Sequence, residues 1–208
     1  MSTRGRVVVM VLVLGLPAIC VAQPADVESD AAVTQSSVIE GVEAIGEPYG
    51  RTRWHVELTG GFFLEAWDLN QFRDQLLGGT IGFSRRVAPH WTIGVETSLL
   101  RVSRQPVGGL LLPAVSVVLR RTVFQVGDTV VFLESGGGAS YASDEVPDSG
   151  TRFNLVAQTG VGLTRAMSPR IDVVGGLRWL HVSNNSLNGK ARNPDIQALG
   201  LYFGWRVK

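Results

Sequence analysis

The feature that most constrains the fold is an alternation of apolar and polar residues that recurs from residue 53 to the C-terminus. Side chains of a β-strand point alternately to the two faces of its sheet, so this period of two predicts strands. No window after Arg53 shows the apolar stripe of an amphipathic helix. The eight predicted strands cover 53–66, 77–87, 91–104, 110–124, 129–141, 151–166, 170–183 and 195–207.

The connections between these predicted strands alternate in length. Three are tight, at 88–90, 125–128 and 167–169, and four are longer and polar, at 67–76, 105–109, 142–150 and 184–194. Short turns at one end and longer loops at the other are typical of barrels in the bacterial outer membrane. The pattern therefore predicts an all-β fold, namely an eight-stranded antiparallel up-and-down transmembrane β-barrel.

The position of the bulky apolar residues separates a membrane barrel from a soluble one. In the segment 195–207, Leu199, Leu201, Phe203, Trp205 and Val207 share one face, whereas the other face mixes glycine with polar and charged residues. Lipid contact requires a bulky apolar outer face, and a narrow lumen requires small or paired side chains. A soluble lipid-binding barrel is the alternative, and it would place the bulky residues inside. The bulky apolar face and the glycine-rich polar face of this segment favour the membrane barrel.

Acidic and basic residues fall on the predicted inner face in equal number. Because a buried charge needs a partner, we expect ion pairs that cross the lumen and fill it, which argues against a porin. Residues at the strand ends could instead lie in water. The residues at inward positions are Glu57, Glu96, Glu134, Asp172, Arg120, Arg152, Arg178 and Arg206.

The first residues of the chain have the pattern of a secretory signal peptide at 1–22. A positively charged start precedes the apolar run Val7–Leu16, and small residues surround Ala22. A transmembrane anchor is less favoured because the apolar run is shorter than the roughly 20 residues that a spanning helix needs. A lipidated Cys20 is less favoured because isoleucine precedes it. We therefore expect cleavage after Ala22 and export from the cytoplasm.

The predicted mature chain divides into two parts. Residues 23–50 are acidic and poor in aromatic residues, which predicts a weakly ordered periplasmic leader. Residues 51–208 form the predicted barrel. The net charge of +1 offers no basic field for nucleic acid. The three histidines belong to different strands or turns and form no cluster with metal-ligand spacing, so we expect neither a metal nor another cofactor.

A polar stretch near the C-terminus, HVSNNSLNGKARNPDIQ, contains the candidate functional residues. His181 and Ser183 are two positions apart and share the outer face, close to the longer loops. Asp195 and Gln197 share the outer face of the next strand, and antiparallel pairing can bring Gln197 close to His181. A histidine beside a serine hydroxyl is the pair that nucleophilic ester hydrolysis requires. The alternative is a hydrophilic loop that lies in water above the hydrocarbon.

The C-terminal half resembles the outer-membrane lipid A 3-O-deacylases, the PagL type, also called acyloxyacyl hydrolases. The resemblance rests on FLESGGGASY, GTRFNLVAQTGVGL, GGLRWLHVSN and NPDIQALGLYFGW; it covers residues 131–208 well and the first four predicted strands loosely. It implies an eight-stranded outer-membrane barrel that releases the acyl chain esterified at position 3 of lipid A. It also implies a Ser-His-Glu triad on the outer wall.

The resemblance assigns roles to several residues of the polar stretch. His181 matches the general base and Ser183 the nucleophile. Asn184 matches an oxyanion-hole residue, and a backbone donor near Ser186 stands where the family often has glycine. These roles imply no metal.

One position departs from the family pattern. The glutamate of the triad falls on Gln197, which cannot carry the negative charge that stabilises an imidazolium. Two arrangements stay open: Gln197 accepts a hydrogen bond from His181 Nδ1 and supports slow chemistry, or Asp195, two residues earlier on the same face, is the surrogate acid. Two functions follow: an active esterase, or a non-catalytic structural or lipid-binding barrel that has lost the triad acid.

The resemblance also implies partners and a location. We expect lipid A or lipopolysaccharide as substrate, and a multi-pass protein in the cell outer membrane of a Gram-negative-type bacterium. The sequence leaves the oligomeric state open, a homodimer included.

Overall fold

The computed structural model describes residues 54–66, 74–103, 108–187, 189 and 193–208. The predicted signal peptide at 1–22 and the predicted leader at 23–50 lie outside the described residues. Within the described ranges, no helix has the length and apolar character needed to span a membrane.

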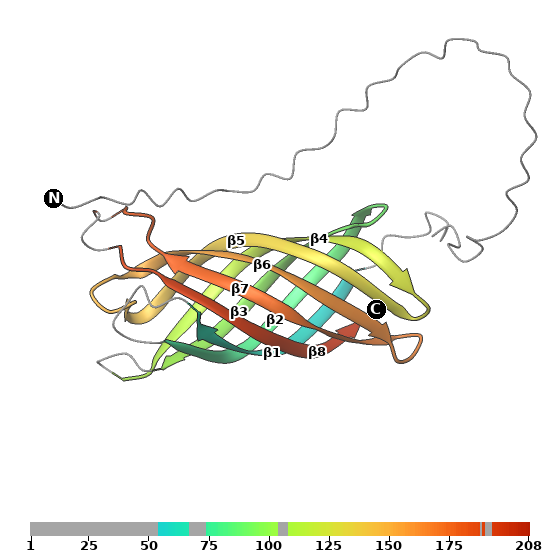
Figure 1. Cartoon of the computed structure of the whole chain (residues 1–208), viewed down its shortest axis with the longest axis horizontal. Helices are drawn as coiled ribbons and strands as arrows, with labels where there is room; N and C mark the ends of the chain where they lie inside the picture. The colour runs from blue at the N-terminus through green and yellow to red at the C-terminus, as the bar shows by residue number, and fades with distance from the viewer. Residues whose placement is uncertain (1–53, 67–73, 104–107, 188, 190–192) are drawn as a thin grey trace, which may run out of the picture. The chain divides into compact units, whose positions relative to one another are not determined.

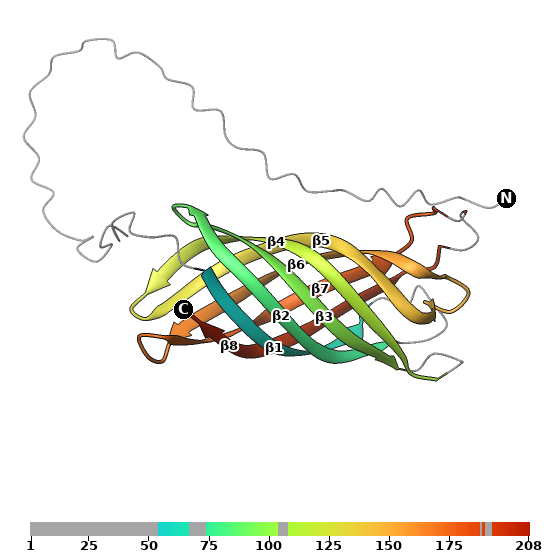
Figure 2. The ribbon, with the colours of Figure 1, turned by 180° about the vertical axis from the view of Figure 1, so that it is seen from behind.

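Eight strands form a closed barrel in which neighbours in the sequence pair antiparallel and the first strand pairs with the last (Figures 1 and 2). This confirms the predicted up-and-down barrel, and the strands are tilted in both views. The strands are β1 (Trp54–Glu65), β2 (Gln75–Ala88), β3 (Trp91–Ser103), β4 (Leu110–Val126), β5 (Thr129–Val146), β6 (Thr151–Ala166), β7 (Ile171–Ser183) and β8 (Ile196–Val207).

The two ends of the barrel differ in their connections. The turns after β2, β4 and β6 are short and lie at the end where the chain terminates (Figure 1). His90 and Gly127 adopt positive φ angles of 65° and 53° there, as tight hairpins require. We call this the turn end and the opposite one the loop end. The turn end corresponds to the periplasmic side of an outer-membrane barrel.

β5 is longer than its polar sequence predicts. The alternation stops near Tyr141, yet the strand continues to Val146 after a shift in its register with β6. The Ser143 hydroxyl accepts a hydrogen bond from the Leu111 backbone amide at 2.9 Å, which ties the extension to β4. The strand therefore continues through residues whose polar side chains do not show the apolar alternation that predicts a strand.

The outward face of the barrel is apolar along its height. Leu201 is 66% exposed, Ile81 49% and Val117 51%, and each lies on a different strand. Such a continuous exposed apolar surface is stable against lipid and not against water. The soluble lipid-binding barrel, which would bury these side chains, is therefore wrong for this chain.

The lumen contains two layers of different chemistry. The layer nearer the turn end is a buried charge cluster, formed by Arg120 and Arg178 with Glu57, Glu96 and Glu134. The layer nearer the loop end is apolar. It includes Phe63, Leu76, Leu100, Val102, Leu110, Leu112, Val156, Leu180, Val182 and Ile196. Predicted ion pairs are present nearer the turn end, whereas apolar side chains fill the layer nearer the loop end.

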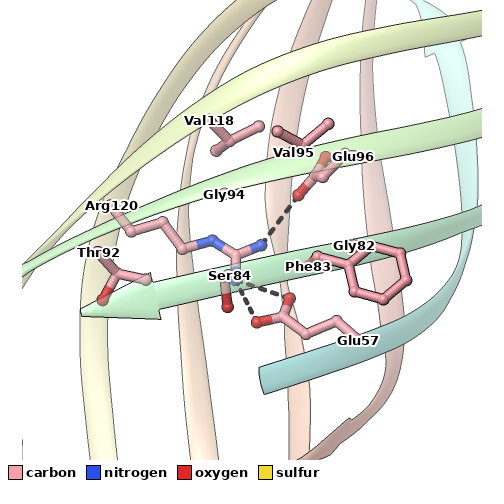
Figure 3. A pocket seen from close by; sticks show the side chains of 10 residues that line it. All are labelled: Glu57, Gly82, Phe83, Ser84, Thr92, Gly94, Val95, Glu96, Val118 and Arg120. Carbon is pink, nitrogen blue, oxygen red and sulfur yellow. Dashed lines mark hydrogen bonds and ion pairs between the residues drawn. The ribbon is translucent and has the colours of Figure 1, made fainter. Parts of the chain in front are cut away.

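Arg120 is the centre of the charge cluster. Its Nη1 atom lies 2.6 Å from Glu57 Oε1, and its Nη2 atom lies 3.1 Å from Glu96 Oε1 (Figure 3). Arg178 donates from Nε to Glu134 Oε1 at 2.7 Å and from Nη1 to Glu96 Oε2 at 2.9 Å. These buried charged side chains thus join five strands across the lumen through ion pairs.

Three of the residues predicted for this network lie elsewhere. Arg152 is exposed at the loop end of β6 and donates to the Ala142 carbonyl at 3.3 Å, because its position lies beyond the lumen. Asp172 and Arg206 form a separate pair near the turn end. Lys208 Nζ joins them, 2.7 Å from Asp172 Oδ1. The prediction of one network formed by all eight charged residues was therefore wrong.

The charge cluster predicts unequal effects of two substitutions. It holds three carboxylates and two guanidinium groups, so removing Arg120 leaves an excess of buried negative charge. Arg120→Met should lower the free energy of unfolding by about 3–5 kcal/mol. Glu57→Gln balances the remaining charges and should cost less than about 1.5 kcal/mol. Urea unfolding in detergent, followed by tryptophan fluorescence, measures both, and equal losses would contradict this account.

Candidate active site on the outer wall

The site lies near the loop end of β7. His181 and Ser183 are two residues apart on this strand, so both side chains take the outward face, and Val182 between them is buried in the lumen with 1% exposure. β8 runs antiparallel beside β7 and places Gln197 directly opposite His181. On the other side, Leu155 of β6 lies opposite Ser183. Sheet register therefore assembles the site.

The histidine and the serine are in direct contact. His181 Nε2 lies 2.9 Å from Ser183 Oγ, which is hydrogen-bonding distance. The imidazole is half-buried and stacks on Trp179, with ring centroids 5.7 Å apart and planes inclined by 19°. Ser183 is only 6% exposed. The two side chains thus sit in a packed environment in which a neutral imidazole can accept the hydroxyl proton.

A carboxylate stands on the other side of the imidazole. Asp195 Oδ2 lies 3.5 Å from His181 Nδ1, the nitrogen that does not face the serine. The same oxygen accepts a hydrogen bond from Gln197 Nε2 at 2.8 Å. Gln197 therefore contacts the carboxylate with its amide nitrogen. The contacts therefore run from Ser183 to His181, from His181 to Asp195 and from Asp195 to Gln197.

Asn184 and Ser186 shape the turn that follows the serine. Asn184 is 1% exposed; its Nδ2 donates to Thr151 Oγ1 at 3.0 Å and its Oδ1 accepts from the Ser186 amide at 2.9 Å. Asn185 and Ser186 adopt φ angles of 50° and 62°, and the Leu187 amide donates to the Asn184 carbonyl at 3.0 Å. The chain therefore reverses sharply after Ser183. Both predicted oxyanion donors have partners: Asn184 Nδ2 bonds Thr151 of β6, and the Ser186 amide bonds Asn184 within the turn.

Two neighbours of the site have little or no signal in the sequence. Thr151 anchors Asn184 although the residues are 33 positions apart, and only the register of β6 on β7 brings them together. Trp179 has the period-two spacing from His181 that predicts a shared face, but its stacking on the ring depends on the side-chain geometry.

Apolar side chains surround the polar group on the wall. Leu155 is 37% exposed and Leu199 is 40% exposed, on the strands at either side of β7. Within the described ranges, no cluster of three or more His, Cys, Asp and Glu side chains is arranged to bind a metal ion.

The comparison with solved structures finds the same barrel architecture in Neisserial surface protein A. Neisserial surface protein A superposes with a TM-score of 0.59 at 14% identity, covering 74% of this chain and 96% of that one. The outer membrane protein W of E. coli gives a TM-score of 0.49 at 9% identity, over 77% of this chain and all of that one. No curated protein sequence matches the chain.

The family comparison covers the barrel and the site together. The model of the family described as "Lipid A 3-O-deacylase (PagL)" matches residues 46–206. This range includes β1 to β7 and all but the last residue of β8. It also includes the dyad of His181 and Ser183, together with Asp195 and Gln197. The chain is an eight-stranded barrel of the outer-membrane type and belongs to the lipid A 3-O-deacylase family.

Proposed function

We propose that the protein is an outer-membrane esterase that hydrolyses the acyl ester at position 3 of lipid A, with Ser183 as nucleophile. The observation that carries this proposal is the 2.9 Å contact between His181 Nε2 and Ser183 Oγ on the outward face of the barrel. A serine with an adjacent base is the minimal device for covalent ester hydrolysis. Its position on the wall suits a substrate whose acyl chains lie in the membrane.

The first half of the reaction forms an acyl-enzyme. Ser183 Oγ attacks the ester carbonyl carbon while His181 Nε2 takes the hydroxyl proton. The tetrahedral intermediate then collapses, and the bond between the carbonyl carbon and the sugar oxygen breaks. The imidazolium returns its proton to that oxygen, so the sugar leaves with a free 3-hydroxyl group.

The second half restores the serine. A water molecule gives a proton to His181 Nε2 and attacks the carbonyl carbon of the acyl-enzyme. The ester bond to Ser183 Oγ breaks, and the proton returns from the imidazolium to the serine oxygen. The products are a free fatty acid and lipid A with one acyl chain fewer.

Asp195 supplies the negative charge for the imidazolium in both halves. A carboxylate beside Nδ1 keeps the proton on that nitrogen and stabilises the positive charge that forms. Its 3.5 Å distance is longer than a direct hydrogen bond, and contacts of catalytic groups often shorten when substrate binds. Gln197 orients the carboxylate through its 2.8 Å hydrogen bond. A carboxylate in this place favours an active enzyme over a barrel that has lost its acid.

The contribution of Asn184 and Ser186 to the oxyanion site stays a prediction. An oxyanion needs donors about 2.7–3.1 Å from the oxygen that becomes charged. Asn184 Nδ2 donates to Thr151 Oγ1, and it would have to direct a hydrogen toward the substrate oxygen to contribute. The Ser186 amide would have to exchange its bond to Asn184 Oδ1 for one to the substrate.

Mass spectrometry of lipid A tests the proposed function. The purified full-length chain is incubated in detergent with lipopolysaccharide. Lipid A is then released by mild hydrolysis, and its mass is measured. We expect loss of the acyl chain at position 3 and an equal amount of free fatty acid. Unchanged lipid A in the presence of folded barrel would overturn the proposal and leave a structural or lipid-binding role.

A further inference from the structure

The indole ring of Trp179 lies beside the dyad, on the side toward the middle of the wall. Trp179 is two residues before His181 on β7, so both side chains take the outward face. The ring centroids are 5.7 Å apart and the planes are inclined by only 19°, so the two rings stack nearly parallel. The indole and the imidazole are both half-buried. The base of the dyad thus has an aromatic face as its neighbour.

The charge that His181 acquires on taking a proton has one charged partner among the described residues. Asp195 is that partner, and its Oδ2 atom lies 3.5 Å from Nδ1. The same oxygen accepts the 2.8 Å bond from Gln197. The neighbouring strands place Ala157 of β6 and Gln197 of β8 opposite His181, and neither side chain is charged. The imidazolium therefore has a carboxylate nearby but no short hydrogen bond to it.

The surroundings of the imidazole make such a charge costly. Leu155 and Leu199 lie on the strands at either side, and Ser183 is almost buried. A charge that leaves water for an apolar environment requires stabilisation. The face of an aromatic ring carries partial negative charge and attracts a cation within about 6 Å of its centroid, and tryptophan does so most strongly. The stacked indole meets this distance.

We propose that Trp179 stabilises the imidazolium form of His181 and thereby accelerates both halves of the ester hydrolysis. The effect on rate depends on the proposed function, whereas the effect on the histidine does not. A neutral imidazole gains little from the charge on the indole face, but a protonated one is attracted to it. The stabilisation therefore grows as the proton passes from Ser183 to Nε2, and only such a difference accelerates a step. Trp179 acts on the face of the ring, and Asp195 acts at Nδ1.

Fluorination of the indole tests this role, because fluorine withdraws charge from the face of the ring and hardly changes its shape. Mono-, di- and trifluorotryptophan are incorporated at position 179 of the full-length chain, and kcat/KM is measured with lipopolysaccharide in detergent. We expect a stepwise fall that reaches about ten-fold, the size of a partly desolvated cation–π attraction. A packing contact would be kept or improved, since fluorine makes the ring more apolar. An unchanged or raised rate in the active enzyme would overturn the proposal.

Titration of His181 separates this proposal from the proposed function. The histidines are labelled with ¹³C, and the His181 signal is identified by its loss in His181→Gln. We expect the midpoint of the titration to move about one pH unit lower with trifluorotryptophan, because a less stabilised imidazolium releases its proton at lower pH. This shift in a protein that leaves lipid A intact would support the role of Trp179 and reject the hydrolysis. An unchanged midpoint would overturn the role of Trp179.

Trp205 provides the matched control. It is an outward residue of β8 with 50% exposure, and its ring contacts Phe203 at a centroid distance of 6.2 Å. The same fluorinated residues there should change neither the rate nor the titration.

If the fluorinated chains do not fold, two substitutions replace them. Trp179→Phe keeps an aromatic face and should lower kcat/KM by about three-fold or less. Trp179→Leu keeps an apolar side chain without that face and should lower it by about ten-fold. Equal losses in the two variants would overturn the proposal, because the aromatic face would then contribute nothing beyond apolar contact.

Discussion

Ser183→Ala is expected to lower the rate of 3-O-deacylation by at least about 10³-fold while leaving the barrel folded. The substitution removes the only atom that the mechanism uses to form the acyl-enzyme. Ser183 lies on the outer wall, and its 2.9 Å partner is His181, so no lumen contact depends on its hydroxyl. The measurement is the same lipid A assay, with heat-dependent electrophoretic migration as the check of folding.

Ser135→Ala is the matched control for this substitution. Ser135 is an exposed outward residue of β5, and it lies directly opposite Thr159 of β6 rather than beside the dyad. Its removal deletes an equivalent hydroxyl from the same surface and should leave the rate unchanged. A Ser183→Ala variant with the wild-type rate would refute the covalent mechanism, whichever product is formed.

The second large effect is expected at the acid. Asp195→Asn should lower the rate by about 10⁴-fold, the order that the same change produces in a serine protease triad. The amide cannot stabilise the imidazolium and can hold the wrong tautomer of His181. Asp195→Asn/Gln197→Glu should recover the rate to within about 10²-fold of the wild type, because residue 197 lies opposite His181 in the sheet.

This double substitution separates two explanations of the glutamine. If Asp195 is the acid, its single substitution inactivates the enzyme and the relocated carboxylate restores activity. If the single variant keeps its activity, Gln197 orients the imidazole without a charge and Asp195 is dispensable. Gln197→Ala provides a further comparison: it removes only the 2.8 Å contact to Asp195 and should cost about ten-fold.

The sequence was sufficient to predict the barrel because lipid and lumen impose opposite chemistry on alternate residues. Leu201 and Tyr202 illustrate this, since one is 66% exposed on the wall and the next is 5% exposed in the lumen. The same period placed His181 and Ser183 on one face. Antiparallel order along the chain then brought Gln197 beside them without any need for long-range information.

Other features depended on contacts that a linear pattern does not contain. Arg152 has inward parity but lies past the lumen, and parity alone does not show where a lumen ends. Leu112 and Leu180 occupy inward positions on the strands that also carry the inward Arg120 and Arg178, yet the two leucines belong to an apolar layer. The sequence named Asp195 as a surrogate acid, but its 3.5 Å distance from His181 depends on the path of the segment that leads into β8.

The outward direction of His181 and Ser183 has a kinetic consequence. Under the proposed function, substrate would reach them by lateral diffusion within the membrane surface, so its effective concentration would be a mole fraction in two dimensions. Adding inert detergent or phospholipid at constant bulk lipopolysaccharide would slow turnover by separating enzyme from substrate in that surface. Saturation would be governed by the crowding of the leaflet around β6, β7 and β8, and hardly by the volume of the surrounding water.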